Sequence, residues 1–147
     1  MLECLGQAKQ KIQIADSRGR FSGVLVHGTL GFVPLYLVRQ GQLEIKIRES
    51  ETGSIGATYA RLAVGSFSQV EGGGSLFSIG GVWLTGAASK HLEMQAGLTF
   101  QILEGGSGFP IPSGSIGYRF QPPGSGHLFR IGAGYPEAVF LGFGFCF

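Results

Sequence analysis

EAVFLGFGFCF, the stretch from Glu137 to Phe147, decides the fold, because its side chains alternate between two kinds. Successive side chains of a β-strand point to opposite faces, so one face of this stretch is a continuous apolar stripe. The opposite face carries mostly small residues. A strand of this kind is typical of the wall of a small β-barrel that stands in lipid. The apolar face comprises Val139, Leu141, Phe143, Phe145 and Phe147, and the opposite face comprises Ala138, Phe140, Gly142, Gly144 and Cys146.

Four earlier stretches repeat this two-sided pattern, at residues 57–67, 91–103, 114–121 and 127–135. One face of each stretch is apolar, and the other is small, polar or charged. A surface that faces water would be denser in Lys and Glu, whereas a narrow lumen favours glycine and a few opposite charges that neutralise one another. We therefore expect a network of lumen charges formed by Arg61, Glu93, Arg119 and Arg130.

The composition agrees with a membrane barrel. Charged residues make up only 14% of the 147 residues, whereas they make up about 25% of a typical soluble domain. The chain has the length of one domain, 44% of it is hydrophobic, and glycine supplies 27 positions. The longest apolar run, Phe21 to Val38, is interrupted by polar residues, a proline and glycines, so we expect no transmembrane helix. The eleven basic residues are scattered, so we expect no nucleic-acid partner.

The pattern predicts an all-β fold, an eight-stranded antiparallel up-and-down transmembrane β-barrel. We expect an N-terminal extension or extra strand over residues 1–30 and the barrel domain over residues 31–147, with residues 23–27 as a further candidate strand. An even strand number allows both chain ends to lie on the periplasmic side, with longer loops outside. The expected strands are at about 31–38, 42–49, 57–67, 75–84, 91–103, 114–121, 127–135 and 138–147; the periplasmic turns are 50–56, 85–90 and 121–126, and the outer loops are 39–41, 68–74, 104–113 and 136–137.

The C-terminal part of the chain resembles small bacterial outer-membrane β-barrel proteins. Phe147 at the end, Phe145 two positions earlier and Gly142 look like the terminal signal that the insertion machinery of these barrels recognises. The resemblance implies a bacterial outer-membrane location, contact with the lipid bilayer, and the insertion machinery as a partner of the C-terminal strand. The similarity includes residues 81–100 and 114–135 and covers roughly residues 54–147.

Candidate chemical sites are weak in this sequence. His91 and His127 each follow an expected periplasmic turn, but two histidines without a third ligand favour ordinary rim residues over a metal site. Arg119, Arg130 and Glu93 could bind an anion or act in catalysis, but an ion-pair network is the preferred interpretation, because desolvated charges need partners. No serine stands in a nucleophile-elbow context. We therefore expect neither an enzyme nor a cofactor.

The expected role is structural, or one of surface interaction. Eight strands enclose only enough space for side chains, so we expect a plugged lumen. A surface partner would then be bound by the outer loops, above all through Phe109 and Ile111. The alternative is a soluble lipocalin-like barrel whose apolar face points inward around an apolar ligand.

The ends of the chain leave two questions open. Cys4 and Cys146 stand at opposite ends, and their spacing does not decide whether they pair. The N-terminal residues have no apolar core of signal-peptide length. If the protein is exported, we therefore expect this chain to be a mature or truncated form.

Overall fold

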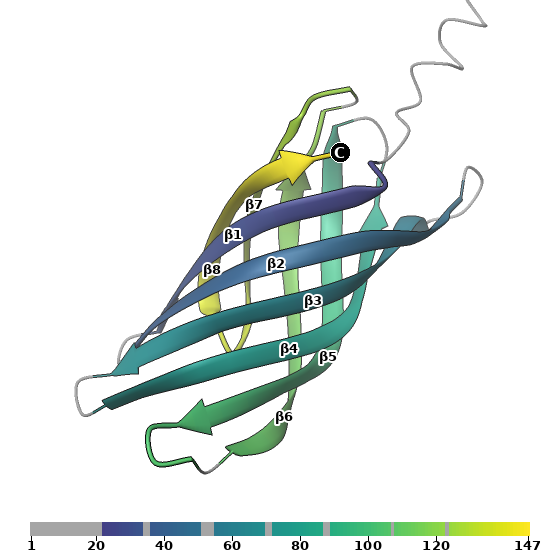
Figure 1. Cartoon of the computed structure of the whole chain (residues 1–147). Helices are drawn as coiled ribbons and strands as arrows, with labels where there is room; N and C mark the ends of the chain where they lie inside the picture. Colours follow the sequence, from purple (N-terminus) through teal and green to yellow (C-terminus); the bar gives the residue numbers. More distant parts are fainter. Residues whose placement is uncertain are drawn as a thin grey trace, which may run out of the picture.

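The computed structural model describes residues 22–33, 36–50, 55–69, 72–86, 89–106, 108–122 and 124–147. These residues form eight β-strands that close into one antiparallel barrel (Figure 1). Each strand pairs with its neighbours in the sequence, and β1 also pairs with β8. The strands are β1 (Val24–Val33), β2 (Tyr36–Glu49), β3 (Ile55–Gln69), β4 (Gly72–Thr85), β5 (Lys90–Leu103), β6 (Gly108–Phe120), β7 (His127–Tyr135) and β8 (Ala138–Cys146).

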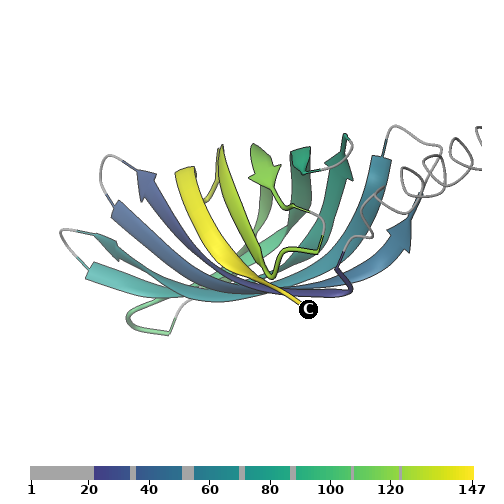
Figure 2. The same cartoon turned by 90° about the horizontal axis from the view of Figure 1, so that it is seen from above.

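The closure of the barrel confirms the predicted all-β fold with eight antiparallel strands in up-and-down order. Strand β8, the stretch with the apolar stripe, lies beside β1, as Figure 2 shows. This pairing joins the two ends of the sheet, so every strand has two partner strands. The antiparallel, up-and-down order of eight strands is the order that the sequence predicts.

The first two strands differ from the prediction. Strand β1 begins at Val24, and β2 runs without interruption through residues 39–41, which had been expected to form a loop. The expected strands at 31–38 and 42–49 are therefore wrong, and β1 begins within residues 1–30, the segment expected as an N-terminal extension or extra strand. The candidate strand at residues 23–27 is the start of β1. Residues 1–21, including Cys4, lie outside the described part of the chain.

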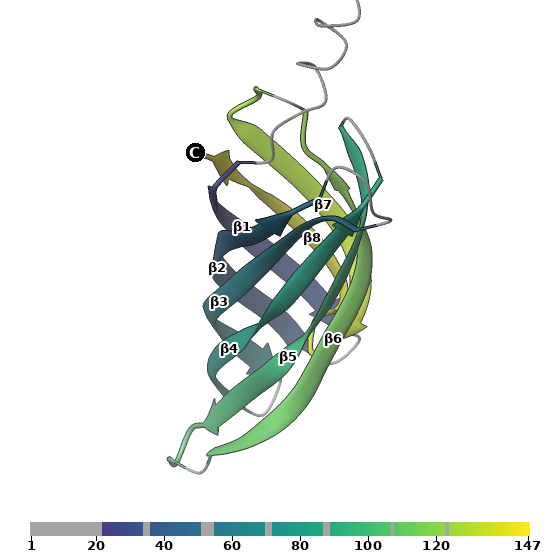
Figure 3. The ribbon, with the colours of Figure 1, turned by 90° about the vertical axis from the view of Figure 1, so that its right-hand side faces the viewer.

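The barrel has two rims, which we name for what they carry. The terminal rim holds the start of β1, the end of β8 and the connections β2–β3, β4–β5 and β6–β7. The hairpin rim holds the other four connections. The three expected periplasmic turns thus lie at one end of the barrel together with the C-terminus, as predicted (Figure 1). In Figures 1 and 3 the β5–β6 hairpin projects furthest beyond the hairpin rim.

The polarity of the barrel is inverted relative to a soluble domain. Large apolar side chains that are exposed outnumber those that are buried, and they occur on all eight strands. The buried set is rich in polar and charged side chains, including Glu44, Glu93, Arg119 and Arg130. Strand β5 illustrates this, since its residues alternate between buried polar and exposed apolar side chains. No helix among the described residues is long and apolar enough to cross a membrane.

The interior is arranged in layers along the barrel axis. Near the terminal rim an apolar cluster is formed by Leu25, Ala57, Tyr59, Val82, Leu84 and Leu128. Near the hairpin rim a smaller apolar cluster is formed by Val38, Phe67 and Leu76, with Tyr36 packed against it. The buried charges lie between these two clusters. Buried side chains thus occupy the barrel interior near both rims and between them.

Candidate functional site

Four charged side chains meet in the middle of the barrel, and we call them the charge cluster: Glu44 of β2, Glu93 of β5, Arg119 of β6 and Arg130 of β7. Arg119 Nη1 lies 2.8 Å from Glu44 Oε2, and Arg119 Nε donates to Glu93 Oε2 over 2.5 Å. Arg130 forms an ion pair with Glu93, and its Nη1 lies 3.8 Å from Glu44 Oε1. Each arginine thus contacts both glutamates. The two positive charges and two negative charges neutralise one another in a site that is shielded from water.

Polar side chains surround the charge cluster. His27 Nε2 lies 3.0 Å from Glu44 Oε1, and Gln42 accepts a hydrogen bond of 2.8 Å from Arg130 Nη1. Gln95 donates a hydrogen bond to Glu93. Each of these contacts falls on a carboxylate or guanidinium atom that also takes part in an ion pair of the charge cluster. The charge cluster is therefore part of a connected polar network.

An aromatic ring packs against each arginine of the charge cluster. The guanidinium of Arg119 lies 5.9 Å from the centroid of the Tyr59 ring, and that of Arg130 lies 4.8 Å from the centroid of the Phe140 ring. Both distances lie within the range of cation–π attraction. Gly142 gives Arg130 its room, since a Cβ at this glycine would stand 2.6 Å from Arg130 Cγ. The small face of the C-terminal strand thus serves the packing of one buried arginine.

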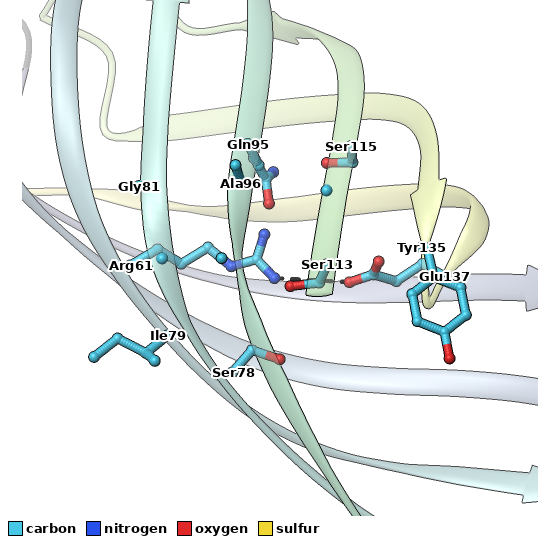
Figure 4. Close-up of a pocket in the computed structure, with 13 residues that line it drawn as sticks. Arg61, Ser78, Ile79, Gly81, Gln95, Ala96, Ser113, Ser115, Tyr135 and Glu137 are labelled. Atoms are coloured by element: carbon cyan, nitrogen blue, oxygen red, sulfur yellow. Dashed lines mark ion pairs between the residues drawn. The ribbon is translucent and has the colours of Figure 1, made fainter. Parts of the chain in front are cut away.

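Arg61 stands apart from the charge cluster. Its Nη2 lies 3.7 Å from Oε1 of Glu137, in a polar cavity that Ser78, Gln95 and Ser113 also line (Figure 4). The cavity measures about 10 Å³, which is close to the least volume that holds one water molecule. Arg61 therefore has its own counter-charge, nearer the hairpin rim, and the cavity is too small for a larger ligand.

The sequence pattern does not reveal three members of the network, Glu44, His27 and Gln42. The pattern predicts a loop at residues 39–41, within β2, so it does not show which residues of this strand share a face. A signal is nevertheless present, because Gln40, Gln42 and Glu44 recur at every second position, and the last two alternate with the apolar Leu43 and Ile45. All three of these side chains are buried.

The two histidines considered for a metal point to opposite faces. His91 is buried on the lumen side of β5, and His127 is exposed on the outer side of β7. Among the described residues no group of three or more His, Cys, Asp or Glu side chains could hold a metal ion. The charge cluster instead connects strands β2, β5, β6 and β7 through side-chain ion pairs, and we call this set of contacts the brace.

The residues of the expected C-terminal signal all belong to or directly follow β8. Gly142 faces the lumen, whereas Phe145 and Phe147 are exposed on the outer face. Phe147 is held by its backbone, since its N–H donates to the carbonyl of Val24 and its carbonyl accepts from the N–H groups of Gly23 and Val24. The two phenylalanines are therefore presented on the outer surface by a strand whose end is paired.

Phe109 and Ile111 lie in β6, not in the outer loop expected over residues 104–113. Strand β6 begins at Gly108, and only residues 104–107 connect it to β5. Phe109 is exposed and Ile111 is half-buried, and both lie on the same side of β6 as Arg119. They therefore face the lumen side of the projecting hairpin.

The projecting part of β6 has an open edge. Strand β6 pairs with β5 from Gly108 onward, but its pairing with β7 covers only Gly114 to Phe120. The backbone N–H of Gln121 donates to the carbonyl of Ser89, next to β5. Because backbone groups alternate in direction along an antiparallel strand, the N–H and C=O groups of odd-numbered residues in β6 point towards β5, and those of even-numbered residues point towards β7. Pro110 and Pro112 are even-numbered, and proline has no backbone N–H. The open edge therefore lacks a hydrogen-bond donor at these two positions. Proline at an edge strand hinders pairing with another chain.

Comparisons with known proteins give no family for the chain. No protein-family model matches it, and no curated protein or solved structure is significantly similar to it.

Proposed function

We propose that this chain is a transmembrane β-barrel of a bacterial outer membrane, with a plugged lumen and a structural or surface-interaction role. The observation that carries the proposal is the inverted polarity of the barrel. Soluble monomers rarely expose contiguous apolar surface of this extent, whereas lipid-facing barrel strands require it. The strands have 9 to 15 residues, which fits the ~9 to 11 residues that a strand needs to cross the hydrocarbon core.

The alternative of a soluble lipocalin-like barrel requires the opposite arrangement. Such a barrel would turn its apolar faces inward around an apolar ligand and its polar faces towards water. Here the charge cluster and its polar neighbours occupy the interior, and residues such as Leu30, Val64 and Phe143 are exposed. These observations favour lipid around the barrel over an apolar ligand within it.

The filled interior supports a role other than transport. The charge cluster lies between two apolar clusters, and each layer is formed by side chains from several strands. A permanent aqueous channel would need an open path through all three layers. We infer that the parts that could select a partner are the connections at the rims and the projecting β5–β6 hairpin, since binding usually resides in such segments on a rigid scaffold.

Membrane fractionation with heat-modifiable gel mobility tests the proposal. We expect the protein to sediment with outer membranes, to require detergent for extraction, and to migrate differently before and after boiling, because a closed barrel resists unfolding by detergent. Partners follow from the same proposal: the lipid bilayer, and the barrel insertion machinery acting on β8. A monodisperse monomer in buffer without detergent would overturn it.

A further inference from the structure

Two glycines lie side by side on the outer face of the barrel. Gly28 of β1 pairs with Gly41 of β2, with Val64 next to Gly41 and Phe143 next to Gly28 in the same row. Both flanking side chains are more than half exposed, at 60% for Val64 and 56% for Phe143. The side chains of Val64 and Phe143 therefore stand above the surface on either side of the two glycines, which have no side chains.

The barrel itself does not need these two glycines. A Cβ at Gly28 would come no closer than 3.9 Å to another atom, and a Cβ at Gly41 no closer than 4.0 Å, which are ordinary contacts. By contrast, a Cβ at the lumen-facing Gly117 would stand 2.6 Å from a carbonyl oxygen. A glycine within a strand weakens it and often marks a place where a ligand approaches the backbone.

The missing side chains leave a groove of about 560 Å³ on the outer surface. Its floor is the backbone around the two glycines. Its walls are mostly apolar, and they are formed by Leu30, Val64, Phe129, Leu141 and Phe143, with Arg39 and Ser66 at one end.

Arg39 gives the groove a charged end. In the register of β1, β2 and β3, Arg39 lies between Leu30 and Ser66, one row nearer the hairpin rim than the glycines. Its side chain is exposed, and it forms no ion pair with any acidic residue that the structure describes. An arginine on an apolar outer surface near a rim is suited to binding an anion at the level of lipid headgroups.

We propose that this groove binds one membrane lipid, with an acyl chain over Gly28 and Gly41 and the headgroup phosphate bound by Arg39. The inference rests on the proposed membrane location. The guanidinium can donate two parallel hydrogen bonds to phosphate oxygens, and Ser66 lies beside it in the same row. The glycines let the chain lie against the strand backbone between two raised walls.

A second copy of the barrel fits the groove less well. A two-fold contact would have to provide a counter-charge for Arg39 from the same surface patch. The residues that line the groove include no acidic side chain. A lipid phosphate supplies that charge, and its acyl chain supplies apolar contact of the right width.

Native mass spectrometry of the detergent-solubilised full chain tests the inference. The probes are dioleoyl phosphatidylglycerol and dioleoylglycerol, which share acyl chains and differ in the phosphate. We expect the phosphate-bearing lipid to bind with one-to-one stoichiometry, and Arg39→Gln to weaken it by about tenfold or more, because hydrogen bonds to charged groups are lost. Arg48→Gln is the control, since Arg48 is exposed on the same strand near the terminal rim.

Filling the groove gives the second arm of the test. The double variant Gly28→Leu, Gly41→Leu should fold, because there is room for each Cβ, and it should lose the bound lipid. Ala60→Leu, on the outer face of β3, is the control and should retain the bound lipid. Equal retention of both probes by the wild type, or unchanged retention by either groove variant, would overturn the inference. So would a dimer that the leucine variant dissociates, because the occupant would then be a second copy. Heat-modifiability is measured on the same samples, and its absence would instead refute the proposed function.

Discussion

Arg119 and Glu44 lie 75 positions apart in the chain, yet their side chains meet at 2.8 Å inside the barrel. Their strands, β6 and β2, do not pair with one another in the sheet. The contact therefore crosses the lumen and joins opposite walls. With Glu93 and Arg130 completing the charge cluster, strands β2, β5, β6 and β7 are braced from within as well as by their backbone hydrogen bonds.

The brace predicts that Glu93→Gln destabilises the barrel strongly. Glu93 contacts both Arg119 and Arg130, and removing one partner of a buried ion pair typically costs about 3 to 5 kcal/mol. Urea unfolding of the barrel in detergent or lipid vesicles measures the loss. Met94→Leu, the next residue on the outer face, is the control and should cost less than about 1.5 kcal/mol. Equal free energies of unfolding for the two variants would contradict the brace.

The Arg61–Glu137 pair should matter less. Its atoms are 3.7 Å apart, and the Arg61 side chain keeps 11% of its exposure, so water still solvates it in part. We expect Arg61→Gln to reduce the free energy of unfolding by less than the about 3 to 5 kcal/mol typical of a broken buried ion pair, because Arg61 makes one ion pair of 3.7 Å whereas Arg119 contacts both Glu44 and Glu93. The comparison is with Arg119→Gln in the same urea assay. A larger loss for Arg61→Gln would mean that Arg61 belongs to the brace.

The outer face predicts a depth-dependent response to charge. Phe143 lies mid-strand in β8 and is exposed, so under the proposed membrane location Phe143→Arg should cost about 2 to 4 kcal/mol in lipid vesicles. Phe147→Arg, just beyond the strand end, should cost only about 0 to 1 kcal/mol. Both variants are compared by their urea midpoints. Equal costs at the two positions would argue against a bilayer around this strand.

The sequence was most informative where the alternation is unbroken. Strand β5 was expected at residues 91–103 and runs from Lys90 to Leu103, because six apolar residues alternate with polar ones without a gap. The region of β1 and β2 was divided wrongly, because Arg39 and Gly41 interrupt the outer apolar face and resemble a turn. Arg39 and Gly41 on the outer face thus make β2 difficult to predict from the sequence. The same two residues line the groove.

The site was predictable in part for the same reason. Glu93, Arg119 and Arg130 were found because each alternates with apolar neighbours in a well-defined strand. Their contacts with Glu44 depend on how far the strands are staggered around the closed barrel. That stagger is set by the pairing register of all eight strands, which a single strand pattern does not contain. The separate position of Arg61 follows from the same register.

The open edge of β6 predicts a gain of self-association. Pro110→Thr together with Pro112→Thr would restore two backbone donors on the edge that β7 leaves unpaired. We expect the double variant to form dimers or larger species in size-exclusion chromatography with light scattering, while the wild type stays monodisperse. Ser113→Thr is the control, because its N–H faces β5. If the double variant behaved as the wild type does, edge protection would not be the role of the prolines.

The layered interior predicts that the barrel forms no stable pore. An ion would have to cross the apolar cluster around Tyr59 and Leu84, displace the charge cluster, and then pass the apolar cluster around Phe67. We therefore expect planar-bilayer recordings of the purified protein to show no steady single-channel conductance.

Variants can separate the contributions of the layers to this closure. Glu44→Ala together with Arg119→Ala removes a cross-lumen contact but leaves both apolar clusters in place, so it should destabilise the barrel without opening it. Adding Leu84→Ala and Phe67→Ala thins the apolar layers on either side, and conductance should then appear as brief openings, because water gains a path. Steady conductance of the wild type would contradict a filled lumen, and steady conductance of the charge variant alone would assign the closure to the ion pairs.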